Sequence, residues 1–258
     1  MSTYNTLIVK QTDEIVTVTL NRPKLNLFNQ PMVEELIQVW HSLRHNSTAR
    51  FVILTAQGNH FSAGADLKEI GQGELSAEDA RRGQLAGHEM MRSLESVEQV
   101  TVAALKGIVC GAGMAIAQAC DFRIMAEDSY YIVPETNIGT YYTWGCTPRL
   151  VRMVGASKAM EIIMACDPIP AQEAYRLNLA NKVVPNNIVL EATQEFIAKI
   201  ASKSPTCIRL TKKIALGASM EGFGNMFFCE PELMQEVVYT GETQKGIEAF
   251  IQKRQPKF

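Results

Sequence analysis

Hydrophobic and polar positions follow two different periods in the N-terminal part of the chain. Residues 7–20 alternate around a polar break at 11–14, and the β-branched run at 15–20 keeps the period of two typical of a strand. This pattern predicts a hairpin. Residues 32–43 place apolar side chains three and four positions apart, which predicts an amphipathic helix, and the short apolar run at 51–55 predicts a buried strand.

The middle of the chain continues the alternation of helix and strand. A long helix is expected over residues 77–97, followed by a strand at 102–105 that stops at Gly107. Residues 111–120 are small and apolar throughout, which suits a helix packed inside the protein. A further strand is expected at 122–125.

Beyond Pro170 the pattern is almost wholly helical, apart from a strand expected at residues 182–184. Strands that alternate with helices and then give way to helices predict an α/β core with a helical C-terminal region. The chain divides most readily into two regions at residues 202–205. We therefore expect a core over residues 1–200 and a helical region over residues 201–258.

Composition and charge narrow the class of protein. The chain has 258 residues, 47% of them hydrophobic and 20% charged, which is enough for one large globular domain. Lysine and arginine number 25 against 27 aspartates and glutamates, so no excess of positive charge attracts nucleic acid or an anionic membrane. The six cysteines form no C-x-x-C pair and have no histidine at ligand spacing, so we expect reduced thiols, no zinc and no disulfide framework.

Targeting signals are not evident in the sequence. Residues 1–10 are polar and mixed, without the basic and apolar segments of a signal peptide. No stretch stays apolar for the roughly 18 residues that a membrane-spanning helix needs. A cytoplasmic protein without membrane association is the expectation.

Two glycine-bearing segments carry the candidate chemistry. Residues 61–67 read FSAGADL and residues 107–115 read GIVCGAGMA, and each follows a predicted strand and opens a helix. Small residues at such a turn let a ligand approach the backbone, and two free N–H groups that converge make an oxyanion hole. For either segment taken alone, a tight strand-to-helix turn with glycines for packing is the favoured interpretation. Neither matches a nucleotide-phosphate motif.

Five motifs in order carry a resemblance to a known family. They are NRP at 21–23, FSAGADL at 61–67, GIVCGAGMAIAQACD at 107–121, PETNIG at 134–139 and KGIEAFIQKRQPKF at 245–258. In this order they strongly resemble the crotonase (enoyl-CoA hydratase/isomerase) superfamily. The resemblance implies an α/β fold with a spiral β-β-α core, a helical C-terminal region that builds trimers or hexamers, and an acyl-CoA thioester as substrate, with an acyl-carrier-protein thioester as an alternative donor. It implies no metal and no redox cofactor, since CoA is part of the substrate.

The resemblance also assigns the catalytic positions. The family's two oxyanion-hole N–H donors fall on Ala65 and Ala112, and the glutamate of its P-E-x-x-x-G motif is Glu135. Hydratases of the family carry a second glutamate where this sequence has Ala115. Because two carboxylates hold and activate water whereas one suffices to move a proton, the sequence favours a single-base Δ3,Δ2-enoyl-CoA isomerase.

Other interpretations of the same residues stay open. A hydratase or dehydratase working with Glu135 alone, helped by Tyr141 or Tyr142, would add water to the substrate. A non-catalytic acyl-CoA-binding protein would keep the fold without turnover. Judged without the resemblance, Glu135 fits a solvent-exposed turn carboxylate next to a proline.

Substrate-binding positions follow from the resemblance as well. Backbone groups at Ala63, Asp66 and Leu67 are expected to hold CoA. Basic and aromatic side chains are expected near its phosphates and adenine, from the same or a neighbouring subunit: Lys24, Lys68, Phe250 and Lys253. Aromatic residues replace the glycine-rich stretch of hydratases and either reshape the acyl pocket or pack in the core: Tyr141, Tyr142 and Trp144. His88 is expected to be an exposed or helix-face histidine.

Overall fold

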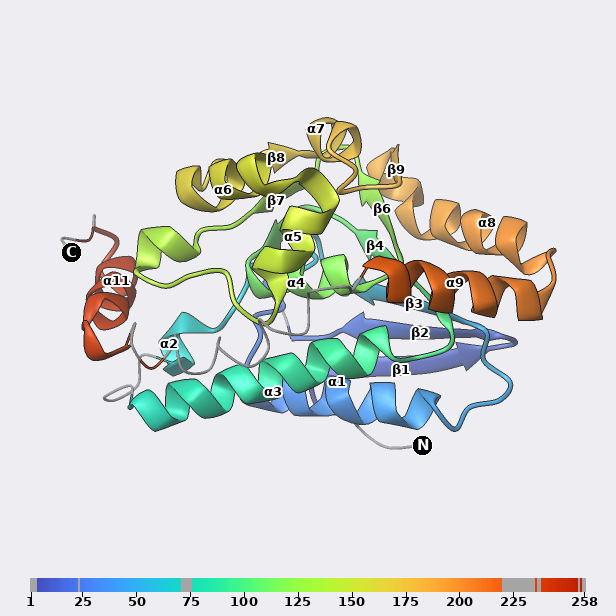
Figure 1. The fold of residues 1–258 in the computed structure, drawn as a ribbon, viewed down its shortest axis with the longest axis horizontal. Helices are drawn as coiled ribbons and strands as arrows, with labels where there is room; N and C mark the ends of the chain where they lie inside the picture. Colours follow the sequence, from blue (N-terminus) through green and yellow to red (C-terminus); the bar gives the residue numbers. More distant parts are fainter. Residues whose placement is uncertain are drawn as a thin grey trace.

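The computed structural model describes residues 4–22, 24–70, 76–219, 235, 238–254 and 256, and Figure 1 shows its fold. Six strands form the main sheet in the order β1-β2-β3-β4-β6-β9, and three form a second sheet in the order β5-β7-β8. The strands are β1 (Leu7–Thr12), β2 (Ile15–Leu20), β3 (Phe51–Ala56), β4 (Val100–Leu105), β5 (Ile108–Cys110), β6 (Phe122–Ala126), β7 (Tyr130–Ile132), β8 (Ile169–Pro170) and β9 (Lys182–Val184).

Helices cover both faces of the main sheet (Figure 1). They are α1 (Gln30–Leu43), α2 (Leu67–Ile70), α3 (Ala77–Glu95), α4 (Ala112–Ala119), α5 (Cys146–Val154), α6 (Ala156–Ala165), α7 (Ala171–Arg176), α8 (Val189–Ala201), α9 (Pro205–Ser219) and α11 (Glu242–Ile251). Two 3-10 turns, η1 (Glu135–Ile138) and η2 (Asn186–Ile188), complete the described elements.

The elements expected from periodicity are present. β1 and β2 pair as the antiparallel hairpin, with Leu7 opposite Leu20. Every other pairing in the main sheet is parallel, as the alternation of helices and strands predicts. The helices expected at 32–43, 77–97 and 111–120 are α1, α3 and α4, each within two residues of the predicted limits, and β9 has its predicted limits.

The central strands are buried on both faces, which explains their unbroken apolar sequence. Along β3, Val52 and Leu54 belong to the core under α1, α3 and α4, whereas Phe51 and Ile53 belong to the core under α8. All six residues of β3 are buried. A parallel strand covered on both sides reads as a continuous apolar run because neither face meets water.

Two parts of the fold were not predicted from the sequence. β5 and β7 pair in parallel and β8 joins β7 antiparallel, forming the second sheet. Helices α5 and α6 fill residues 146–165, ahead of the point at which the helical pattern was expected to begin. The chain therefore turns from the main sheet into a smaller one after β4, so that strands and helices wind in the succession that the resemblance implies.

The C-terminal helix packs against the segment that carries Glu135. Thr243 Oγ1 on α11 donates to the Gly139 carbonyl at 2.9 Å. A Cβ at Gly246 would overlap the Ile138 carbonyl, so α11 approaches η1 as closely as glycine allows. The boundary between residues 1–200 and 201–258, and the association of the latter into trimers, stay predictions. Pro23, Cys229 and the end of the C-terminal motif lie outside the described residues.

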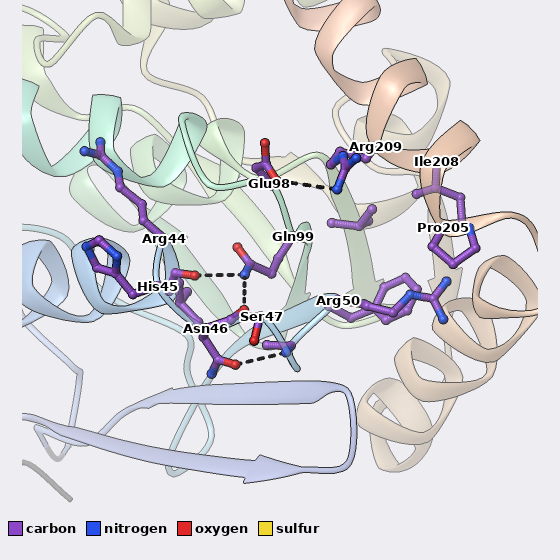
Figure 2. A pocket seen from close by; sticks show the side chains of 14 residues that line it. Arg44, His45, Asn46, Ser47, Arg50, Glu98, Gln99, Pro205, Ile208 and Arg209 are labelled. Atoms are coloured by element: carbon purple, nitrogen blue, oxygen red, sulfur yellow. Dashed lines mark hydrogen bonds and ion pairs between the residues drawn. The ribbon is translucent and has the colours of Figure 1, made fainter.

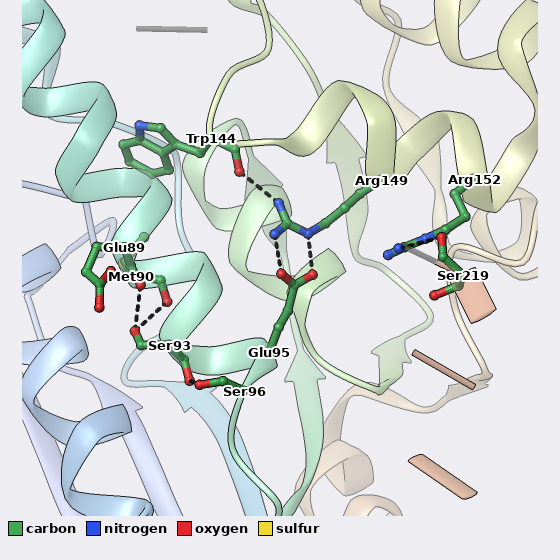
Figure 3. A network of polar contacts seen from close by, with 9 residues as sticks. All are labelled: Glu89, Met90, Ser93, Glu95, Ser96, Trp144, Arg149, Arg152 and Ser219. Atoms are coloured by element: carbon green, nitrogen blue, oxygen red, sulfur yellow. Dashed lines mark hydrogen bonds and ion pairs between the residues drawn. The ribbon is translucent and has the colours of Figure 1, made fainter. Parts of the chain in front are cut away.

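A buried ion pair connects α3 to α5, and its arginine also binds the loop before α5 (Figure 3). Arg149 is fully buried, and its Nε and Nη2 each donate to the Glu95 carboxylate at 2.6 Å. Its Nη1 donates to the Trp144 carbonyl at 2.8 Å. The pair therefore fixes a loop whose Trp144 has a left-handed φ of 58°.

The described cysteines are free thiols at positions 110, 120, 146, 166 and 207. None of the helices within the described ranges has the length and apolar character needed to cross a membrane.

Replacing Glu95 by glutamine tests the buried pair. Glu95→Gln leaves the Arg149 guanidinium buried without a full counter-charge, so we expect the free energy of unfolding to fall by about 3–5 kcal/mol in urea titrations. Glu161→Gln removes the same charge from the exposed Lys158–Glu161 pair on α6 and should change it by less than about 1 kcal/mol. Equal effects of the two substitutions would contradict a structural role for the buried pair.

Candidate active site

The two glycine-bearing segments lie side by side at the carboxyl ends of β3 and β4. Ser62 N donates to the Ile108 carbonyl at 3.0 Å, and Cys110 N donates to the Ser62 carbonyl at 2.9 Å. This single parallel bridge between Ser62 and Val109 aligns the segments that lead to Ala65 and Ala112. The carboxyl ends of parallel strands are where open α/β sheets bind ligands.

The amides of Ala65 and Ala112 are both available for a ligand. The neighbouring amides of Gly64 and Asp66 donate to Ser62 Oγ at 3.1 Å and to the Phe28 carbonyl at 2.8 Å. In the parallel bridge, Phe28 bonds to the residues on either side of Ala65, so the N–H of Ala65 points away from Phe28. Ala112 is the first residue of α4, and the N–H of a first helical residue has no acceptor within the helix. Neither amide finds an acceptor within the described part of the chain.

Glycines at three positions permit this close approach. A Cβ at Gly113 would lie 2.8 Å from the Ser62 Cβ, so α4 packs directly on the first segment. Gly111 has φ 45°, and a Cβ there would lie 3.9 Å from the Gly64 Cα and 2.6 Å from Glu135 Oε1. The two segments and the Glu135 carboxyl group therefore meet at Gly111.

Glu135 is not the solvent-exposed turn carboxylate that its neighbours suggest. It opens η1, its Oε2 is shielded from solvent, and this oxygen has no hydrogen-bond partner among the described residues. Burial raises the pKa of Glu135 to about 7, against a small lowering by its own backbone N–H. A carboxyl group with this pKa accepts or donates a proton near neutral pH.

Helix α4 supplies no second carboxylate to accompany Glu135. Ala115, at the position where family hydratases have glutamate, is almost fully buried. Cys110 lies beside Gly64, with its Sγ 3.5 Å from the place of a Gly64 Cβ. Burial, helped by the negative charge of Glu135, raises the pKa of this thiol to about 12, so Cys110 is a neutral wall residue and not a nucleophile.

The aromatic loop after η1 forms another wall. Tyr142 is buried, and its hydroxyl donates to Gln118 Oε1 on α4 at 3.3 Å. Burial raises the pKa of Tyr142, with smaller contributions from Cys146 and from the charge of Glu135. The Trp144 indole packs against α3 where Gly87 has no side chain. Tyr141 is half-buried beside them.

Gln118 was missed in the sequence because it stands in an otherwise apolar run. The only signal for it was a polar residue three positions after Ala115, on the same face of a helix expected to be buried. His88 was expected to be exposed or to lie on a helix face; it lies on a face of α3, and this face is buried.

The residues expected to bind CoA fall into two groups. The amides of Ala63, Asp66 and Leu67 donate within the chain, to the carbonyls of Leu25, Phe28 and Ala65 respectively, so a contact with CoA has to use their carbonyl groups. The other group consists of solvent-exposed side chains: Lys24, Lys68, Phe250 and Lys253.

Asp66 and the C-terminal helix add detail to these positions. The Asp66 carboxylate pairs with Arg22 at 2.7 Å; burial acts to raise its pKa, but the bonds from Arg22 and the Glu69 amide hold this pKa below its usual value. α11, which carries Phe250, contacts α2, which carries Lys68, and Figure 1 shows the two helices together at one end of the molecule.

A separate hollow of about 660 Å³ lies at the amino ends of β3 and β4 (Figure 2). Its lining includes Arg44, Arg50, Gln99 and Arg209, and none of the residues predicted from the sequence. A strand the length of β3 separates it from the glycine-bearing segments by roughly 17 Å. Within the described ranges, no three His, Cys, Asp or Glu side chains gather closely enough to hold a metal ion.

Comparisons with known proteins identify the family of the chain. The enoyl-CoA hydratase/isomerase family model matches residues 10–258. A short-chain-enoyl-CoA hydratase of Clostridium acetobutylicum is 33% identical over 97% of this chain and 96% of its own. The crystal structure of an enoyl-CoA hydratase from Mycobacterium avium subsp. paratuberculosis superposes with a TM-score of 0.89 at 24% identity, covering 99% of both chains. A monofunctional enoyl-CoA isomerase from M. smegmatis gives 0.70 at 27% identity, over 84% of this chain and 97% of the other.

The chain belongs to the enoyl-CoA hydratase/isomerase family, the crotonase superfamily. It is an enzyme of this superfamily with the crotonase fold, and it acts on acyl-CoA.

The raised pKa of Glu135 predicts how stability depends on pH. The unfolded chain releases this proton near pH 4.5 and the folded chain only near pH 7, so burial of the group destabilises the fold progressively between these values. Glu135→Gln should be more stable than the wild type by about 3 kcal/mol above pH 7 and should lose this advantage below pH 4.5. Urea titrations at pH 4.5, 6 and 8 measure the difference. A constant difference across this range would show that the pKa is not raised.

Gly113→Ala tests the close approach of the two segments. The added methyl group must push α4 away from Ser62 and misalign the amides of Ala65 and Ala112. We expect kcat/KM for enoyl-CoA thioesters to fall about 100-fold. Gly83→Ala on α3 meets no atom within 4 Å and should retain full turnover. Unchanged turnover in Gly113→Ala would show that the positions of the two amides do not matter for catalysis.

Proposed function

We propose that this protein is a Δ3,Δ2-enoyl-CoA isomerase that uses Glu135 as its single acid–base group. The observation that carries the proposal is the contact of the Glu135 carboxyl group with Gly111, next to two unoccupied amides, in a site where Ala115 supplies no second carboxylate. The likeness to a monofunctional enoyl-CoA isomerase supports the same reaction.

The amides of Ala65 and Ala112 would bind the thioester oxygen. Negative charge on this oxygen grows when the C2 proton leaves, so two preorganised donors stabilise the enolate more than the ground state. The first turn of α4 adds the positive end of its dipole at Ala112. A thioester α-proton thereby becomes acidic enough for a carboxylate to remove.

The proton moves through one carboxyl group. The Glu135 carboxylate takes a proton from C2 of the 3-enoyl thioester, and the electron pair of that C–H bond enters a dienolate. The same carboxylic acid then protonates C4, the double bond moves from C3–C4 to C2–C3, and the thioester carbonyl is restored. A pKa of about 7 suits both halves of this transfer.

Hydration is the second candidate, and the relatives favour it. Several of them carry the name enoyl-CoA hydratase, including the Clostridium acetobutylicum protein at 33% identity. In this version Glu135 alone would activate a water molecule, with Tyr142 or Tyr141 as a polar neighbour. The absence of a carboxylate at Ala115 weighs against it, because one carboxyl group must then both position the water and deliver the proton.

The remaining expectations on binding and assembly form part of the proposal. CoA would lie across α2 toward α11, using the carbonyls of Ala63, Asp66 and Leu67. Its phosphates and adenine would meet the exposed side chains of Lys24, Lys68, Phe250 and Lys253. Trimers or hexamers would form through the C-terminal region, and the chemistry would need no metal or redox cofactor.

Glu135→Gln should abolish turnover without abolishing binding. Incubated with 3-hexenoyl-CoA, the wild type should give 2-hexenoyl-CoA at unchanged mass, with kcat/KM rising with pH to a plateau above about pH 7. The variant should be slower by about 10²- to 10⁴-fold. Glu127→Gln removes an exposed carboxylate between β6 and β7 and should keep full activity.

Incubation of the same proteins with crotonyl-CoA separates the isomerase from the hydratase and from a binding protein. The products are followed by chromatography and mass spectrometry. A gain of one water, lost in Glu135→Gln, would establish the hydratase in place of the isomerase. Binding of both thioesters with no turnover of either would mark a non-catalytic acyl-CoA-binding protein. Full activity in Glu135→Gln would refute the assigned base.

A further inference from the structure

Several elements in and beside the candidate site carry a buried polar atom without a partner. Eight buried side-chain N or O atoms lack a hydrogen-bond partner within the described residues. Four of them belong to α3, α4, η1 and the aromatic loop: Gln84 Oε1, Gln118 Nε2, Glu135 Oε2 and Trp144 Nε1. Since buried polar groups are almost always hydrogen-bonded in native proteins, an unpartnered donor on α4, the helix that begins at Ala112, points to a ligand that completes it.

Gln118 has the best-defined geometry of the four. It lies on α4 three residues after Ala115, so both side chains project from one face of the helix. Its Oε1 accepts the Tyr142 hydroxyl, which fixes the amide so that Nε2 points away from the phenol. Nε2 is buried and finds no acceptor in the part of the chain that the structure describes.

The identity of residue 115 explains why Nε2 has no acceptor. A glutamate at this position would lie one turn from Gln118, where its carboxylate could accept from the amide. Ala115 offers only a methyl group, and it is buried. The Gln118 donor, one turn along α4 from Ala115, is therefore left without an acceptor among the described residues.

We propose that the acyl chain of the substrate carries a neutral oxygen, a hydroxyl or a keto group, which accepts a hydrogen bond from Gln118 Nε2. This inference rests on the proposed function, since it places the acyl chain between Glu135 and α4. Tyr142 orients the donor, and an unsubstituted alkyl chain leaves it unpaired at a cost in affinity.

The charges around Gln118 exclude an acidic acyl chain. Burial raises the pKa of Tyr142, and the charge of Arg149 only opposes this shift. Both edges of the Arg149 guanidinium are already held, by the Glu95 carboxylate and by the Trp144 carbonyl. A carboxylate on the acyl chain would meet the negative charge of Glu135 without a counter-ion. A neutral acceptor meets no such repulsion.

Matched substrates test the proposal. We compare 3-hexenoyl-CoA and 3-octenoyl-CoA with their analogues that carry a hydroxyl on the last carbon. The wild type should show a kcat/KM about tenfold higher for one hydroxylated thioester than for its alkyl counterpart. Gln118→Met should abolish this preference, and Gln194→Met, on the exposed side of α8, should retain it.

Two further arms keep the result interpretable. Gln118→Met leaves the Tyr142 hydroxyl unpaired, so the double variant Gln118→Met/Tyr142→Phe, which removes both polar groups, is measured alongside it. Calorimetry gives a readout that needs no turnover. It measures how tightly Glu135→Gln binds saturated hexanoyl- and octanoyl-CoA and the terminally hydroxylated forms of both. The hydroxylated form should bind about tenfold more tightly, and the double variant should lose the difference.

The outcomes separate this inference from the proposed function. Turnover that depends on Glu135 but shows no preference at either chain length, in rate or in binding, would leave the isomerase standing and overturn the role of Gln118. A binding preference without any turnover would support the role of Gln118 and refute the isomerase. Equal preference in the wild type and the double variant would assign the selectivity to other groups and overturn the proposal.

Discussion

The close approach of two backbone segments at Gly64, Gly111 and Gly113 is the constraint on which the site depends. A side chain at Gly113 would displace α4 from Ser62, and one at Gly111 would displace the Glu135 carboxyl group. Because none is present, the first turn of α4 and the turn after β3 share one small space, with both free amides at its edge. The parallel sheet supplies the rest, since its carboxyl ends deliver both segments to the same place.

The same closeness sets the chemistry of Glu135. A carboxyl group pressed against backbone loses its water without gaining a cation, and its pKa rises to about 7. This burial costs folding stability at neutral pH. The Arg149–Glu95 pair beside the aromatic loop has both partners satisfied, whereas Glu135 and Gln118 keep buried atoms unpaired within the described residues.

Sequence pattern predicted the elements that are long or strongly periodic. The hairpin of β1 and β2 spans enough residues for its period of two to emerge, and β3 and α4 stand out as unbroken apolar runs. β5 and β7 have three residues each, too few for any period, and they depend on partners far along the chain. The burial of Glu135 was equally invisible, since proline, threonine and asparagine surround exposed and buried turns alike.

The loss of the second carboxylate changes more than the number of acid–base groups. Two carboxylates in one site repel each other, so one of them is held protonated and the pair retains a water molecule. With Ala115 in this position, burial dominates the pKa of Glu135, opposed only by its own backbone N–H, and α4 supplies no carboxylate to hold a water molecule. The Gln118 donor stays unpaired among the described residues, and in the proposed mode of binding it faces the acyl chain. The replacement of one glutamate therefore favours proton transfer within the substrate over addition of water, and it opens a polar contact by which acyl chains can be distinguished.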